Sequence, residues 1–121
     1  MELLTKADFK HYSNPGVTSV QFVSPHNSKS ARVTITRVTV EPGAGQPRHS
    51  HKNSEQIWIA VEGEGTLLLG NNMTRVLRAG EVARFAEGDM HGVENTGNDP
   101  FVYLSITSPP VDFAYAYTHH G

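Results

Sequence analysis

The sequence predicts an all-β protein folded as a small barrel, and three observations lead to this prediction. Short segments rich in Val, Ile, Thr and aromatic residues recur along the chain, separated by clusters of Gly, Asn, Asp and Pro, a pattern typical of strands joined by turns. Apolar residues at helical spacing are rare. The apolar residues of the longest such segment also change from one face to the other, as expected of a strand that bends around a closed core.

Eight segments are predicted to form strands, and they fill most of the chain before its tail. They are 17–23, 31–41, 55–61, 65–69, 74–77, 82–85, 93–95 and 101–107. Residues that favour tight turns separate them. Gly70-Asn71-Asn72 is the strongest hairpin signal, because Gly and Asn tolerate the positive φ that tight turns require.

The segment 31–41 contains the apolar residues that change face. Val33 and Ile35 share one face, whereas Val38 and Val40 share the other, so a β-bulge or a strong bend is predicted between the two pairs. After the last predicted strand, two prolines are followed by aromatic residues. We expect this tail to lie across the barrel as an extended segment.

Length and composition limit the classes of protein to consider. The 121 residues are room for one domain, 1–121. The chain has 10 Lys and Arg against 12 Asp and Glu with no basic cluster, which argues against a nucleic-acid partner. No apolar run approaches the roughly 20 residues of a membrane-spanning helix. The acidic start differs from a secretory signal, so a soluble, cytoplasmic protein is expected. Because Cys is absent, any metal must be held by nitrogen and oxygen.

The clearest functional signal is the pair His49 and His51. In an extended strand, residues i and i+2 project to the same face, so both imidazoles can reach one point inside the barrel. Taken alone, such a pair is more often two solvent-exposed loop histidines. A third histidine, His91, follows a turn at the start of a later strand, and Glu55 and Gln56 each offer an oxygen ligand at the start of another. These residues by themselves leave open which oxygen completes the set.

Around these histidines the chain resembles the cupin superfamily in both of its motifs, at about 43–63 and 80–95. The first motif is matched by Gly43, His49, His51, Gln56 and Gly63. The second is matched by Gly80, Gly88, His91 and Asn95, with Ala86 where the family has Pro. The resemblance implies a double-stranded β-helix, or jelly-roll barrel.

The resemblance also implies one divalent metal held by His49, His51, Gln56 and His91. Imidazoles with one oxygen suit Mn, Fe, Ni, Co, Cu or Zn and fit poorly with Mg or Ca. Gln56 has the family spacing to the glycine that ends the motif, whereas Glu55 lies one residue too far from it. A neutral Gln56 leaves the full charge of the metal to polarise bound water or substrate oxygens, and a carboxylate from Glu55 would reduce that charge.

Strand alternation assigns Gln56, Trp58 and Ala60 to one face and Glu55 to the other. If Gln56 faces the metal, Trp58 is expected to form a wall of the substrate pocket, the alternative being an ordinary core residue. Further substrate contacts are expected from Tyr103, Arg32, Arg37 and Arg84.

The tail contributes one more candidate, Asp112. The residues Pro109, Pro110, Asp112 and Phe113 are similar to the tail of small cupins related to uronate-processing proteins, which makes Asp112 a candidate acid or base; the alternative is an exposed loop acid. Asn95 is expected to be a turn residue that makes hydrogen bonds. The remaining histidines are expected to be exposed, and they are His11, His26, His119 and His120.

Two classes of function are compatible with these features. The first is a small metal-dependent enzyme that acts on a small oxygen-rich substrate, such as a sugar acid or keto compound, by isomerase, lyase or dioxygenase chemistry. The second is a non-catalytic barrel that binds a small ligand or a metal as a sensor. Strand edges and the alternating aromatic residues Phe113, Tyr115 and Tyr117 predict a homodimer.

Overall fold

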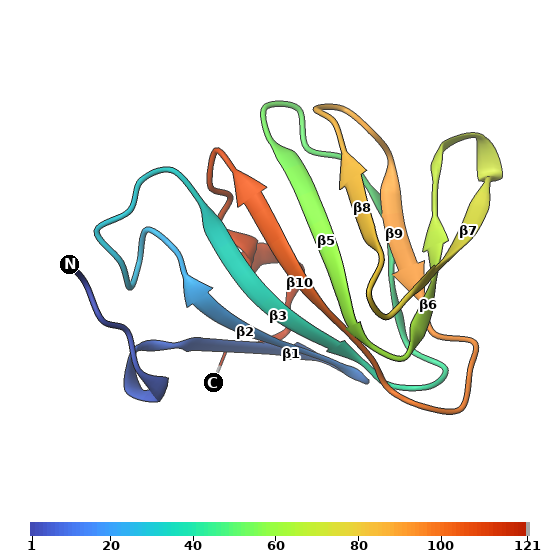
Figure 1. The fold of residues 1–121 in the computed structure, drawn as a ribbon, viewed down its shortest axis with the longest axis horizontal. Helices are drawn as coiled ribbons and strands as arrows, with labels where there is room; N and C mark the ends of the chain where they lie inside the picture. Colours follow the sequence, from blue (N-terminus) through green and yellow to red (C-terminus); the bar gives the residue numbers. More distant parts are fainter. Residues whose placement is uncertain (121) are drawn as a thin grey trace.

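The computed structural model describes residues 1–120, which form two antiparallel β-sheets (Figure 1). The larger sheet has seven strands in the order β11-β1-β2-β3-β10-β5-β8. These are β1 (Lys10–Asn14), β2 (Val17–Val23), β3 (Thr34–Val40), β5 (Glu55–Glu62), β8 (Val82–Phe85), β10 (Phe101–Ser108) and β11 (His119–His120). The smaller sheet, in the order β4-β9-β6-β7, consists of β4 (Gly45–His49), β6 (Glu64–Leu68), β7 (Thr74–Arg78) and β9 (His91–Glu94). The predicted all-β jelly-roll architecture is confirmed.

The helices within residues 1–120 are short 3-10 turns: η1 (Lys6–Asp8), η2 (Gly70–Asn72) and η3 (Phe113–Ala116). None of them is long and apolar enough to cross a membrane. The η2 turn joins β6 to β7, and Asn71 and Asn72 both have a φ of 58°. Positive φ at both central residues is the geometry of a type I′ hairpin turn. The hairpin predicted from Gly70-Asn71-Asn72 is therefore confirmed.

All eight predicted strands are present, with bounds that differ from the prediction by at most three residues. The sequence did not predict β1, β4 or β11. β1 carries mostly polar residues, and β4 contains a proline and two charged or titratable side chains, so neither has the alternation expected of a half-buried strand. Their strand conformation comes from pairing, of β1 with β2 and of β4 with β9.

Within 31–41 a β-bulge or a strong bend was predicted, and the bulge is wrong. β3 pairs with β10 in unbroken register from Thr34 to Val40. The buried inner face of β3 consists of Thr34, Thr36, Val38 and Val40. Because two of these inner residues are threonines, the apolar Ile35, which lies half-buried on the outer face, gave the appearance of a change of face. The register shift lies on the neighbouring strand, between Gln21 and Val23.

The inner face of the larger sheet changes from apolar to polar along its strands. At the end where the strands converge in Figure 1, Val17, Val40 and Phe101 lie side by side and are fully buried. We call these three residues the closed end. Thr36 lies four residues before Val40 on β3, and its neighbours on the adjacent strands are Gln21 and Ser105. The next row away from the closed end consists of Thr34, Thr107 and Gln56. We call these six polar residues the open end.

The apolar core lies between the two sheets and includes the three residues of the closed end. Its buried members are Val17, Val38, Val40, Trp58, Ala60, Leu67, Leu77, Phe85, Val93, Phe101, Tyr103 and Tyr117. Gly63, in the turn between β5 and β6, has a φ of 73°, and a Cβ there would collide with the carbonyl oxygen of Pro100. This turn therefore requires glycine.

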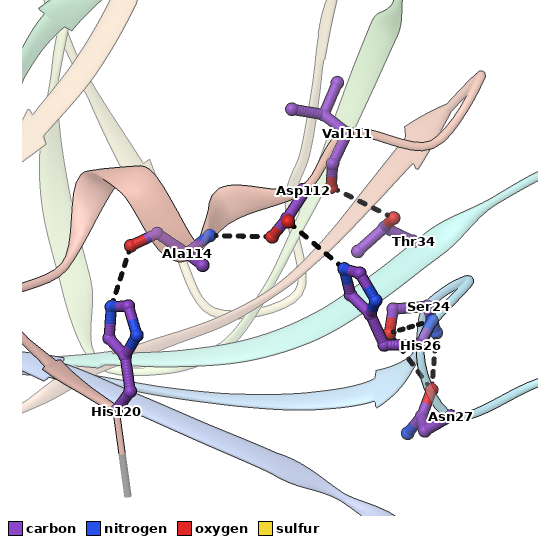
Figure 2. A network of polar contacts seen from close by, with 8 residues as sticks. All are labelled: Ser24, His26, Asn27, Thr34, Val111, Asp112, Ala114 and His120. Atoms are coloured by element: carbon purple, nitrogen blue, oxygen red, sulfur yellow. Dashed lines mark hydrogen bonds and ion pairs between the residues drawn. The ribbon is translucent and has the colours of Figure 1, made fainter.

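The C-terminal tail is not the extended segment predicted. It contains η3, and its end pairs with β1, where His120 lies opposite Tyr12. Figure 2 shows how the tail is held: the Asp112 side chain caps η3 by accepting a hydrogen bond from the Ala114 N–H at 3.0 Å, and it lies 3.1 Å from Nε2 of His26. The tail is thereby tied to the loop that follows β2.

The aromatic residues of this tail turn towards the protein. Tyr117 is buried and Phe113 is half-buried, and of the three tail aromatics Tyr115 alone is largely exposed, at 73%. The alternating aromatic surface from which a homodimer was predicted is therefore absent.

Candidate metal centre

Three histidines from separate places in the sequence meet at one point. His49 is the last residue of β4, His51 follows it in the loop before β5, and His91 begins β9. One ring nitrogen of each lies within 4.8 Å of those of the other two. The ring centroids are 4.4 Å apart for His49 and His91, 5.1 Å for His49 and His51, and 5.3 Å for His51 and His91. The convergence of the three predicted histidines is thus observed, although His51 lies beyond the end of the strand.

Backbone carbonyls fix the direction of two of these rings. Nδ1 of His49 lies 2.8 Å from the carbonyl oxygen of Pro47, and Nδ1 of His91 lies 3.0 Å from that of Asp89. A ring whose Nδ1–H donates to a carbonyl keeps a lone pair on Nε2, which is the arrangement of metal-binding histidines.

The free nitrogens are buried. Nε2 of His51 and Nε2 of His91 have no hydrogen-bond partner among the described residues. Leaving such a nitrogen buried and unpaired costs about 1–3 kcal/mol. Since a metal ion would pair with both, the residues present fit a metal that prefers imidazole ligands.

Burial also keeps these histidines neutral. It lowers the pKa of His91 to about 4, with a further lowering from the neighbouring His49 ring, and it lowers the pKa of His51. Neutral imidazole is the form that binds a metal. His51 and His91 are therefore in their metal-binding form at neutral pH.

Aromatic side chains surround the cluster. Phe85 stacks on His91 at a centroid distance of 4.5 Å, and Trp58 meets the same ring edge-on at 5.7 Å. Phe113 from the tail lies 5.6 Å from the His51 ring. These contacts hold the rings in place and exclude water from one side of the site.

Gln56 and Glu55 lie on opposite faces of β5, as alternation predicted. Gln56 is buried and lines the same cavity as His49. Its Oε1 accepts a hydrogen bond from Nε1 of Trp58 at 2.9 Å, and its Nε2 donates to the Thr107 hydroxyl at 2.8 Å. Glu55 instead accepts a hydrogen bond from Nε of Arg84 at 2.8 Å on the exposed side. The role of Gln56 as the fourth ligand stays a prediction.

A cavity of about 290 Å³ adjoins the cluster at His49, which is the one of the three histidines that lines it. The predicted substrate-contact residues Trp58 and Tyr103 both line it, with their rings stacked at 4.3 Å. The other lining residues are Asn14, Ser19, Thr36, Val38, Gly45, Gln46, Pro47, His49, Gln56, Ser105, Phe113, Tyr115, Ala116 and Tyr117. Among the described residues, no Asp, Glu, Lys or Arg lines this cavity. Substrate binding by Trp58 and Tyr103 stays a prediction.

Several other candidates lie away from the cavity. Arg32, Arg37 and Arg84 are exposed and do not line it. Asp112 is also absent from the lining and serves as the cap of η3, where the Ala114 N–H lowers the pKa of its carboxyl group. The four remaining histidines are exposed as predicted, namely His11, His26, His119 and His120.

Asn95 has the structural role that its motif position indicated. Its side-chain amide donates to the carbonyl oxygens of Val40 at 2.9 Å and Asp99 at 2.8 Å, and its Oδ1 accepts from the Gly97 N–H at 3.0 Å. Asn95 therefore ties the turn after β9 to the end of β3.

The sequence analysis missed the polar residues on the cavity wall. Ser19, Thr36, Gln46 and Ser105 all line the cavity. Strand alternation could have identified two of them, because residues two apart on a strand share a face. Ser105 is two residues from Tyr103 on β10, and Ser19 is two residues from the buried Val17 on β2. A polar residue on the otherwise apolar face of a strand is an informative exception, because most polar residues are exposed.

Comparison with known proteins is consistent with this geometry. The family described as Cupin domain matches residues 36–107. Oxalate oxidase GF-3.8 of Triticum aestivum is 32% identical over 107 residues, which cover 80% of this chain and 48% of that protein. The chain thus spans about half the length of this relative.

Two solved structures show the same fold. KdgF from Halomonas sp. has a TM-score of 0.76 and 20% identity, covering 92% of this chain and 97% of that one. The polyketide cyclase RemF from Streptomyces resistomycificus has a TM-score of 0.77 and 20% identity, covering 90% of this chain and 80% of that one. At these identities the likeness concerns the fold.

Proposed function

The chain belongs to the cupin family, and on that premise we propose that it is a small metal-dependent enzyme acting on a small oxygen-rich substrate. One divalent transition metal, of the group Mn, Fe, Ni, Co, Cu and Zn, binds at His49, His51 and His91. The observation that carries the proposal is the pair of buried, unpartnered Nε2 atoms of His51 and His91, directed into a cluster of three imidazoles. The metal, when bound, supplies a positive charge that polarises ligand oxygens.

We propose Gln56 as the fourth ligand. Its side chain is buried on the inner face of β5 and lines the cavity beside His49. The hydrogen bond from Trp58 uses one lone pair of Oε1 and leaves the second for a metal. The Thr107 hydroxyl accepts a hydrogen bond from Nε2 of Gln56, so the nitrogen end of this amide is directed towards Thr107 and the oxygen end is left for the metal. A set of neutral ligands keeps the whole charge of the metal available to the substrate.

The cavity supports a small-molecule substrate. Its volume of about 290 Å³ lies at the lower end of the range for small-molecule sites. The names of two similar proteins, an oxalate oxidase and a polyketide cyclase, refer to oxygen-rich compounds. This similarity supports an isomerase, lyase or dioxygenase type of reaction here. Trp58 and Tyr103 provide a flat wall against which such a substrate packs.

The second candidate is a cupin that binds a small ligand or metal without turnover. One observation favours it: no carboxylate or amine among the described residues lines the cavity to move a proton. The lining hydroxyls of Tyr103 and Tyr117 are poor proton donors and acceptors at neutral pH, because burial raises the pKa of both.

A screen of the metal-loaded protein separates the two candidates. Oxalate, keto acids and uronic acids are each incubated with protein loaded with one metal of the group, with and without oxygen, and loss of substrate is followed by chromatography. Turnover that disappears in His91→Ala supports the enzyme. Metal and ligand binding without turnover of any compound supports the binding protein.

We also propose a homodimer, on a different surface from the tail. The outer face of the larger sheet carries five half-buried aliphatic residues, which are Ile35, Ile57, Ile59, Leu104 and Ile106. Cross-strand pairing places them together, and Val82, which is 60% exposed, extends the patch at the β8 edge. Light scattering at micromolar concentration is expected to give twice the mass of the chain. A monomer would contradict the proposal.

A further inference from the structure

A second group of buried polar atoms without partners lies away from the histidines, at Thr36 on the cavity wall and at Gln21, which lies next to Thr36 and does not itself line the cavity. Oγ1 of Thr36 and both side-chain amide atoms of Gln21 are buried and have no hydrogen-bond partner among residues 1–120. Thr36 is 4% exposed and Gln21 is 1% exposed. The two residues lie opposite each other on β3 and β2, and Ser105 lies opposite Thr36 on its other side.

The amides that line the cavity are all paired. Gln46 donates to the Tyr117 hydroxyl at 2.8 Å, and Gln56 is held by Trp58 and Thr107. Asn14 donates to the carbonyl oxygen of Ala116 at 2.8 Å. The unpaired atoms are therefore concentrated at one place, at and next to the cavity wall. Leaving buried polar groups without partners is unfavourable, so a ligand that pairs with them gains affinity.

From this arrangement we propose that Thr36 on the cavity wall, with Gln21 beside it, forms a subsite for an uncharged hydroxyl or carbonyl group of the ligand. A hydroxyl and an amide each offer both a donor and an acceptor, which matches a neutral hydroxyl or carbonyl group. A carboxylate at this place would be buried without a cation, because no Lys or Arg among the described residues lines the cavity.

The wall between the subsite and the histidines defines the rest of the ligand. Ser105 lies opposite Trp58 on the neighbouring strand, and Trp58 stacks on Tyr103. This inference rests on the proposed metal function and deepens it. The ligand presents an oxygen pair to the metal, packs a flat face on the aromatic wall and places a neutral oxygen group at Thr36.

Two matched probes test the subsite. Both 3,4-dihydroxybenzyl alcohol and 3,4-dihydroxybenzoate carry adjacent hydroxyls that chelate a metal, and they differ in the neutral or charged group at the other end. Calorimetric titration of the metal-loaded protein is expected to show about tenfold tighter binding of the alcohol, a difference of about 1.4 kcal/mol. Equal or tighter binding of the benzoate would overturn the proposal.

Variants connect the preference to the subsite. Thr36→Val removes the hydroxyl and keeps the shape of the side chain, so it is expected to weaken binding of the alcohol about five- to tenfold and to leave binding of plain catechol unchanged. Thr39→Val is the control, because Thr39 lies on the same strand with its side chain on the outer face. If Thr36→Val binds the alcohol as tightly as the wild type does, the unpaired atoms form hydrogen bonds with water and not with the ligand, and the proposal is wrong.

The metal content of the titrated protein separates this proposal from the proposed function. A protein that binds metal but does not distinguish the two probes contradicts the subsite alone. A protein that binds no metal but still prefers the alcohol, with the preference lost in Thr36→Val, contradicts the metal function and supports the subsite.

Discussion

The two ends of the larger sheet's inner face are built from the same strands and differ in chemistry. At the closed end, Val17, Val40 and Phe101 are completely buried and apolar. At the open end, Gln21, Thr36 and Gln56 are almost as buried, at 1%, 4% and 4%, and are polar. Burial without apolar character contributes little to stability unless every polar atom is paired. The closed end therefore stabilises the fold, whereas the open end contributes less to stability and includes the residues that we propose for ligand binding.

Truncation at the closed end is expected to have the largest effect on stability. Phe101 is fully buried and lies beside Tyr103, with ring centroids 5.3 Å apart. Phe101→Ala should lower the free energy of unfolding by about 3–5 kcal/mol, because it removes apolar burial and leaves a void. Denaturant unfolding followed by fluorescence measures the change. A loss below that of a surface substitution would show that the closed end is not what stabilises the fold.

Acid is expected to weaken the metal-free fold through the histidine cluster, which lies next to the open end. Since the pKa of His91 is lowered from 6.5 to about 4, the unfolded state binds more protons than the folded state between these values. The free energy of unfolding should then fall as the pH falls through this window, by the order of 3 kcal/mol for this histidine. Urea unfolding at several pH values measures the loss. His91→Leu should lose less, and an equal loss in both proteins would contradict the assignment.

Two opposite substitutions on β3, one from Val to Thr and one from Thr to Val, compare the closed end and the open end directly. Val40→Thr places a hydroxyl at the closed end and should cost about 1–3 kcal/mol, whereas Thr36→Val removes an unpaired hydroxyl and should leave the stability unchanged or raise it. Thermal unfolding of the two variants provides the measurement. Similar losses in both would mean that the two ends do not differ as described.

The two faces of β5 provide a smaller but sharper comparison. Gln56→Ala is expected to weaken metal binding at least about tenfold if its amide oxygen completes the ligand set. Glu55→Ala is the matched control and should bind metal as the wild type does, because Glu55 pairs with Arg84 on the exposed side. Calorimetric metal titration gives both affinities. Loss of binding in Glu55→Ala with none in Gln56→Ala would reverse the assignment.

Local sequence patterns predicted those parts of the molecule that depend on local geometry. Alternation along β5 separated Gln56 from Glu55, and the glycine and asparagines of η2 predicted its hairpin turn. The i, i+2 spacing predicted that His49 and His51 lie together, and the family motifs added His91 to them. β4, which carries His49, was missed because its strand conformation depends on pairing with β9.

Features that depend on distant residues had no local signal. Thr36 lies between Gln21 and Ser105 through pairing with β2 and β10, which no window of β3 reveals. For the same reason the inner threonines of β3 gave the false appearance of a bulge. The cap of η3 by Asp112 and its contact with His26 likewise depend on where the tail lies.

The metal content of the purified protein tests the central claim most directly. Elemental analysis after reconstitution with each metal of the predicted group is expected to give about one ion per chain for the wild type. His49→Ala and His91→Ala should retain almost none, while His26→Ala, whose ring is exposed and outside the cluster, should match the wild type. A wild-type protein that binds none of these metals, or a His91→Ala protein that binds as much as the wild type, would contradict the claim that the three histidines form a metal centre.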